Sequence, residues 1–120
     1  MPGLHAERCQ ACNTDTPTLG AEEARQLARE LDGAWVLEEA RLRRRFEFSN
    51  FASAFALATR VALIAEREGH HPELRVGWGY CEVESTTHVA GGLTRNDFIL
   101  AARIDRAASS PLGGRGQTVP

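Results

Sequence analysis

The sequence predicts one α+β domain in which helices cover one face of an antiparallel sheet. Three observations predict it: helical apolar spacing in three separate stretches, alternation of apolar and charged residues over 41–48, and a β-branched and aromatic stretch at 74–87. The expected order is helix, two strands, long helix, one or two strands, helix. Successive strands beside separate helices are typical of an antiparallel α+β fold. A chain of 120 residues suits a single domain with one modest core.

The helices are predicted from apolar stripes and end signals. Residues 20–31 place acids in the first turn and apolar residues on one side, with Gly33 as a stop. Residues 50–68 form the longest predicted helix, and Gly69 follows where a left-handed residue would end it. A last helix is expected over 94–108. In the longest helix, one stripe is expected to face the sheet: Phe51, Phe55, Ala58, Ala62 and Ala65.

The strands are predicted from alternation. A short strand is expected at 34–38. Residues 41–48 (RLRRRFEF) resemble an antiparallel strand with one solvated face, although Arg44 interrupts the apolar side and suggests an edge. Residues 74–87 predict two strands or one bent strand. The two glycines that flank Trp78 indicate a bulge or a close backbone approach to something bound.

Both ends of the chain are expected to lie outside the domain, which spans 18–108. Residues 1–17 lack apolar periodicity and predict a mobile arm, and residues 109–120 predict a disordered tail. No stretch is apolar enough to span a membrane, and the N-terminus has no hydrophobic signal segment. Together with three cysteines, an odd number, this favours a reducing cytoplasm over a disulfide framework.

Composition excludes several classes of function. A net charge of -2 and a pI near 6.1 give no reason to expect nucleic acid or an anionic membrane as a partner. All 14 basic residues are arginines, which excludes Schiff-base chemistry on lysine. His5, Cys9 and Cys12 have the spacing of half a zinc site, but no second half follows. We expect no essential role for them.

The stretch GHHPEL at 69–74 carries the strongest chemical signal. A histidine at a helix end interacts well with the helix dipole, but that accounts for one histidine and not for two. Gly69 lets the chain turn before His70, and Pro72 biases His71 toward an extended conformation. The two imidazoles are therefore expected to be held at fixed angles. Because histidine titrates near neutral pH, the pair suits general acid and base catalysis.

Three other side chains are candidates to act with this pair. Glu66 lies four residues before His70, so it can orient a histidine, or it is simply a solvated surface acid. His88 ends the second strand stretch, and an antiparallel return would bring it near the pair. Asp97 follows Thr94 as in a capping box, and its spacing alone favours that structural role.

A metal site is the alternative for this cluster. Three histidines and a carboxylate can bind zinc or iron. However, adjacent residues in an extended chain point to opposite faces, and metal-binding histidines are more often separated by one or three residues. We therefore expect no metal.

These residues together resemble a known signature, that of the pterin-4a-carbinolamine dehydratases. The similarity extends over roughly residues 20–106, and the arm with Cys9 and Cys12 resembles the bacterial branch. Leu74 departs from the family, in which an aromatic residue is common, and Gly79 and Cys81 replace commoner polar residues. The signature consists of Glu66, His70, His71, Pro72, Trp78, His88 and Asp97, with Trp35 upstream.

The resemblance implies a four-stranded antiparallel sheet with helices on one face, in a homodimer or homotetramer. It implies removal of water from 4a-hydroxytetrahydropterin to give quinonoid dihydropterin, which recycles the pterin of aromatic amino-acid hydroxylases without a metal or organic cofactor. His70 and His88 are expected to transfer protons, and His71 to position the substrate. The implied catalytic residues are His70, His71, His88 and Glu66, and the implied substrate-binding residues are Trp35, Trp78 and Asp97.

Other members of the family imply an alternative without catalysis. Some are dimerisation cofactors of a transcription factor, and others are RuBisCO assembly factors linked to carboxysomes that have lost the histidine signature. This chain keeps the signature, which favours the enzyme. The basic stripe of Arg41, Arg43 and Arg45 leaves a binding role open, although a charged strand face is usually only solvated.

Overall fold

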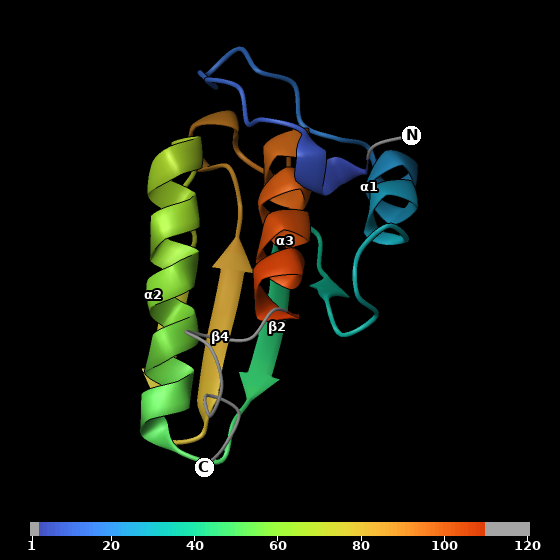
Figure 1. Cartoon of the computed structure of the whole chain (residues 1–120). Coiled ribbons are helices and arrows are strands. Elements are labelled where there is room, and N and C mark those ends of the chain that lie inside the picture. The colour runs from blue at the N-terminus through green and yellow to red at the C-terminus, as the bar shows by residue number, and fades with distance from the viewer. Residues whose placement is uncertain (1–2, 110–120) are drawn as a thin grey trace.

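The computed structural model describes residues 3–109, so the tail predicted beyond residue 109 lies outside the described residues. None of the helices in that range combines the length and hydropathy of a membrane span. Three α-helices and four strands are separated by short connections (Figure 1). Their order is η1 (Leu4–Ala6), α1 (Ala21–Ala28), β1 (Val36–Leu37), β2 (Leu42–Glu47), α2 (Phe51–Glu68), β3 (Glu73–Gly77), β4 (Tyr80–Ser85), η2 (His88–Ala90) and α3 (Arg95–Ala108).

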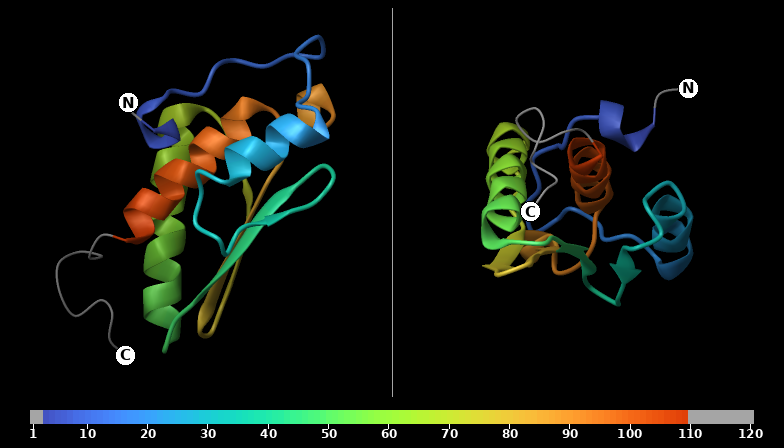
Figure 2. Two further views of the ribbon diagram at one scale, coloured as in Figure 1. Left: turned by 90° about the vertical axis from the view of Figure 1, so that its right-hand side faces the viewer. Right: turned by 60° about the horizontal axis from the view of Figure 1, so that its bottom comes forward.

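The four strands form one antiparallel sheet in the order β1-β2-β4-β3. Figure 2 shows the helices on one face of the sheet, with α2 and α3 side by side and running in opposite directions. The predicted α+β fold is therefore confirmed. Placing β4 between β2 and β3 brings the end of β4, the start of β3 and the start of α3 to the same end of the molecule (Figure 1).

The face of α2 that packs on the sheet differs from the predicted stripe. Phe51 and Phe55 remain 48% and 54% exposed, and their rings stack on each other at 6.0 Å. The neighbouring stripe is just as apolar and has smaller residues near the sheet, so the helix can approach closely. That prediction was wrong for the two phenylalanines and Ala62 but right for Ala58 and Ala65. The buried apolar residues of α2 are Ala54, Leu57, Ala58, Val61 and Ala65.

The stretch around Trp78 is a tight hairpin and not a bulge. Gly77 pairs with Tyr80, so only Trp78 and Gly79 form the turn. Gly79 adopts φ +84°, the left-handed region that glycine tolerates. A Cβ on Gly77 would collide with the Tyr80 ring at 2.5 Å. Local packing of the hairpin is therefore sufficient to account for both glycines, and an approach to something bound stays a prediction.

The charged residues of β2 are matched by nearby acids. Arg44 lies on the core side, where its Nη1 is 2.7 Å from Asp105 Oδ1 and its guanidinium covers the Phe46 ring. Strand β1 pairs only with the first two residues of β2. At Arg44, β2 is therefore an edge of the sheet, as the sequence suggested. On the outer face the basic stripe is neutralised in the pairs Arg41–Glu84, Arg43–Glu38 and Arg45–Glu82.

The N-terminal arm makes contacts with α2 and α3. Leu4 is 2% exposed, and the Cys9 N–H donates to Glu68 Oε1 at 2.9 Å. Burial, and then the Glu68 charge, raises the pKa of the Cys9 thiol to about 12. For Glu68 itself burial opposes ionisation, but the Cys9 N–H, Arg103 and Arg8 outweigh it and lower the pKa. The mobility predicted for the arm stays a prediction.

Candidate active site

The histidine pair lies where α2 ends and β3 begins. Gly69 has φ +67°, and its N–H bonds to Ala65 O, which closes the helix as the sequence predicts. The chain then turns so that His70 points inward and His71 outward. The His70 side chain is 10% exposed, whereas that of His71 is 58% exposed. The two neighbours therefore have different environments.

Asp97 is the centre of the buried part of this site. Its side chain is completely buried in the first turn of α3. The bond from Thr94 N to Asp97 Oδ2, 2.9 Å, confirms the capping role predicted for it. The same carboxylate also holds the imidazole. Its four contacts are His70 Nε2 at 2.7 Å and Ser85 Oγ at 2.6 Å on Oδ1, and Thr87 Oγ1 at 2.7 Å and Thr94 N at 2.9 Å on Oδ2.

An ionised Asp97 would determine the tautomer of His70. The Thr94 N–H can only donate, and an ionised carboxylate can only accept, so an ionised Asp97 requires a hydrogen on His70 Nε2. A neutral His70 then carries its lone pair on Nδ1. Asp97 thus orients the ring and leaves Nδ1 as the atom that can gain or lose a proton.

The second histidine has a carboxylate partner of its own. His71 Nε2 lies 2.8 Å from Glu66 Oε2 on the surface. Glu66 therefore reaches the pair, as the sequence suggested, but it contacts His71 and not His70. Its side chain is 75% exposed, so this contact is weakly held compared with the one at Asp97.

His88 follows Thr87, which contacts the buried part of the site. Glu73 of β3 pairs with Glu84 of β4. Continued past the strand ends, this antiparallel register would place Thr87 opposite His70. Thr87 shares Asp97 with His70, which ties the two segments together. His88 itself is exposed at the start of η2, and its approach to the histidine pair stays a prediction.

The two tryptophans lie elsewhere in this single chain. Trp78 is 71% exposed at the hairpin tip, separated from the histidines by the length of β3, roughly 16 Å. Trp35 is buried, and its Nε1–H donates to Asp105 Oδ1 at 2.7 Å, two turns along α3 from Asp97. A role in shaping the pterin pocket stays a prediction for both.

Sequence reasoning missed two hydroxyl groups of the site, those of Ser85 and Thr87. The signal was present in the alternation of β4, because Cys81, Val83, Ser85 and Thr87 are successive buried positions. Two hydroxyls at core-facing positions need a buried partner, and Asp97 provides it. Between residues 3 and 109, no three His, Cys, Asp or Glu side chains are grouped closely enough to hold a metal ion.

Comparison with known proteins assigns the chain to a family. The family model for pterin 4 alpha carbinolamine dehydratase matches residues 17–107. The chain belongs to the pterin-4-alpha-carbinolamine dehydratase family. The activity that gives the family its name is that of a hydro-lyase, and the match covers both the histidine pair and Asp97.

Relatives and solved structures agree with this assignment. A provisionally named pterin-4-alpha-carbinolamine dehydratase of Methylococcus capsulatus is 44% identical over 88% of this chain and 94% of its own length. A protein of the same name from Nitrosospira multiformis is 45% identical over 85% of this chain and 89% of its own length. The crystal structure of a transcriptional coactivator/pterin dehydratase from Brucella melitensis is 31% identical with a TM-score of 0.70, covering 77% of this chain and 99% of its own.

A second solved structure has a different described role. It is a pterin dehydratase-like protein described as a RuBisCO assembly factor in the α-carboxysome. It is 26% identical with a TM-score of 0.51, and the alignment covers 64% of this chain and 89% of that chain. Members of the family fold are therefore described both as dehydratases and as protein-binding factors.

Proposed function

We propose that this protein removes water from 4a-hydroxytetrahydropterin to give quinonoid dihydropterin and so recycles a pterin cofactor. The observation that carries the proposal is the orientation of His70 by a buried Asp97, with Nε2 and Oδ1 2.7 Å apart. A fixed imidazole with one free nitrogen is suited to move a proton near neutral pH. Family membership supports the choice of substrate.

Dehydration needs two proton transfers. One group protonates the departing 4a-hydroxyl, which leaves as water, and another accepts a proton from a ring nitrogen of the pterin. His70 Nδ1 and the exposed His88 are proposed for these transfers, in either order. His71, held by Glu66, would position the substrate, and a metal or organic cofactor is not required for either step.

The proposal is tested with substrate generated in situ. Turnover is compared among wild type, His70→Ala and His88→Ala after circular dichroism has shown that all three fold. Loss of either proton-transfer group should lower turnover by about a hundredfold or more. If folded wild type does not exceed the spontaneous rate, the enzymatic reading is wrong.

A protein-binding role is the second candidate, and the outer surface of α2 favours it. Phe51, Phe55 and Leu63 are 48%, 54% and 60% exposed on this helix. Apolar groups of this size on one helix are suited to self-association or to a protein partner. Self-association would give the expected homodimer or homotetramer, which sedimentation can measure. A binding factor would keep its partner when His70 is replaced, whereas an enzyme would lose its turnover.

A further inference from the structure

The N-terminal arm passes over the two helix ends that carry the candidate active site (Figure 1). Glu68 is the last residue of α2, and Asn96 lies in the first turn of α3. Two consecutive residues of the arm, Cys9 and Gln10, bind these two side chains through their backbone N–H groups. The arm therefore joins the segment that leads to the histidine pair to the segment that carries its buried carboxylate.

Asn96 binds the arm through both groups of its side-chain amide. Its Oδ1 accepts from the Gln10 N–H at 2.9 Å, and its Nδ2 donates to the Gln10 carbonyl oxygen at 2.6 Å. Asparagine is a weak helix former, and this one is only 6% exposed. The two bonds give it a specific reason to be there, since neither an ionised carboxylate nor an apolar side chain could make both.

The two cysteines of the arm contact the same asparagine. Cys9 Sγ lies 3.6 Å from the Asn96 carbonyl oxygen, and Asn96 Nδ2 also donates to Cys12 Sγ at 3.2 Å. Burial raises the pKa of the Cys9 thiol to about 12, so at neutral pH it stays protonated and is a weak donor. The spacing of the two cysteines thus fits them to enclose Asn96.

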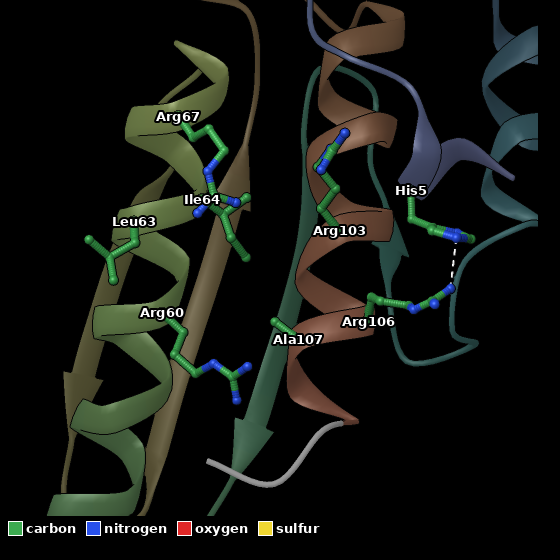
Figure 3. A pocket seen from close by; sticks show the side chains of 8 residues that line it. All are labelled: His5, Arg60, Leu63, Ile64, Arg67, Arg103, Arg106 and Ala107. Carbon is green, nitrogen blue, oxygen red and sulfur yellow. Dashed lines mark hydrogen bonds between the residues drawn. The ribbon is translucent and has the colours of Figure 1, made fainter. Parts of the chain in front are cut away.

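The arm is also fixed further along α3. Arg103 Nε and Nη2 both donate to the Glu7 carbonyl oxygen, at 3.0 and 2.6 Å. Arg106 Nη1 lies 2.7 Å from His5 Nε2, and Figure 3 shows these two side chains turned toward each other beside α3. The residues that follow therefore cross the helix ends from a fixed start.

The buried network around Asp97 leaves the end of α2 to be held by other contacts. Two hydroxyl groups tie Asp97 to β4 and the segment after it, whereas His70 extends from the end of α2. The arm connects Glu68 to Asn96 through two consecutive residues, whose Cα atoms are about 3.8 Å apart. We call this connection the brace. Because it is short, it limits how far the two helix ends can separate.

We propose that Asn96 is a positioning residue for the dehydration, which it serves by linking α3 to the end of α2 through the brace. This inference rests on the proposed function, because the geometry concerned is the 2.7 Å contact between His70 and Asp97. A displacement of about 1 Å at a reacting group can lower a rate by about a hundredfold. The Asn96 side chain is turned to the arm, so its effect reaches the substrate through His70.

The test uses four full-length variants. Asn96→Ala removes the amide that pairs with Gln10. Gln10→Pro removes the Gln10 N–H from the side of the arm, and Gln10→Ala is its control because it keeps that N–H. Arg95→Ala is the control within α3, since it removes the exposed contacts of the adjacent side chain with Glu7, at 2.8 and 2.7 Å, and leaves the brace. Thermal unfolding confirms that each variant is folded at the assay temperature.

Two properties are measured, and the first does not depend on activity. It is the exchange with water of the hydrogen between His70 Nε2 and Asp97 Oδ1, followed by NMR on protein with ¹⁵N-labelled histidine. Asn96→Ala and Gln10→Pro should speed this exchange by about tenfold, because local opening exposes the hydrogen.

The second property is the steady-state rate of dehydration. Asn96→Ala and Gln10→Pro should lower kcat by about tenfold and change KM by less than about twofold, because the brace holds a reacting group and not the substrate. Gln10→Ala and Arg95→Ala should match wild type in both properties.

Three outcomes would overturn the proposal. In the first, Asn96→Ala and Gln10→Pro exchange and turn over like wild type. In the second, Arg95→Ala lowers kcat as much as Asn96→Ala, so that any loosening of the arm has the same effect. In the third, turnover falls while exchange stays at the wild-type rate, so that Asn96 does not act through His70. Absence of turnover in wild type would instead refute the proposed function, and the exchange rates would still decide whether the brace holds His70.

Discussion

Two adjacent histidines make nearly the same contact in very different surroundings. His70 Nε2 lies 2.7 Å from Asp97, and His71 Nε2 lies 2.8 Å from Glu66. In the first pair the side chains are 10% and 0% exposed, and in the second they are 58% and 75% exposed. Distance alone therefore does not separate the two pairs.

The difference lies in what else holds each carboxylate. Asp97 accepts from Ser85, Thr87 and Thr94 as well as from His70, so it has one possible position. Glu66 is a surface side chain that can rotate into water and is screened by salt. A buried network makes Asp97–His70 a fixed unit, while Glu66–His71 is adjustable. This contrast underlies the different roles proposed for the two histidines.

Replacing each carboxylate in turn should give the largest difference between the two pairs, in the stability that each variant loses. Asp97→Ala leaves three donors and an imidazole in the interior without their acceptor. We expect the free energy of unfolding to fall by about 3 kcal/mol or more. Glu66→Ala should change it by less than about 0.5 kcal/mol. Urea denaturation of both variants measures the two values, and similar losses would refute the contrast.

Glu68 offers a second test, because it is a buried acid in the same last turn of α2 as Glu66. Its pKa lies below its ordinary value of 4.5, since the Cys9 N–H, Arg103 and Arg8 outweigh the opposing effect of burial. The stabilisation it provides is therefore complete above that ordinary value and is lost as the pH falls through the lowered pKa.

The variant Glu68→Gln should lose about 2 kcal/mol of stability near neutral pH, the scale of hydrogen bonds to a buried charge. Its stability should also depend less on pH below 4.5 than that of wild type. Urea denaturation across this acid range, with Glu66→Gln as control, measures both effects. A wild-type pH dependence in Glu68→Gln would show that this carboxylate does not anchor the arm.

The smallest effect is expected for Glu66→Gln. The amide can still contact His71, and the position is exposed. Turnover should fall by less than about tenfold, because positioning through a surface pair is worth little free energy. Steady-state kinetics at low and high salt check this, and a loss as large as that of His70→Ala would contradict an adjustable role for His71.

Much of this site could be predicted because it depends on local sequence. Gly69 and Pro72 determine where α2 ends and β3 begins, and Thr94 with Asp97 forms a local cap. Alternation over 41–48 predicted β2 for the same reason. These signals involve only a few neighbouring residues, so they can be recognised without knowledge of the tertiary fold.

What could not be predicted depends on contacts between distant segments. The link from Asp97 to His70 crosses 27 positions and exists only because β4 lies between β2 and β3. Which of the two apolar stripes of α2 faces the sheet likewise depends on how closely the helix and the sheet approach. The sequence does not show this distance, so the prediction that Phe51 and Phe55 face the sheet is wrong. The two tryptophans carried no local signal of where they would lie.

The central claim is that His70, oriented by the buried Asp97, transfers a proton in the dehydration. Its most direct test is the dehydration rate of Asp97→Asn beside that of Glu66→Gln. The amide oxygen can keep the cap at Thr94, while its N–H group donates to His70 Nε2 and shifts the ring hydrogen to Nδ1. For Asp97→Asn, with folding confirmed by circular dichroism, we expect turnover to fall by about a hundredfold or more. Glu66→Gln should stay within about tenfold of wild type. Folded Asp97→Asn with wild-type turnover would contradict the account.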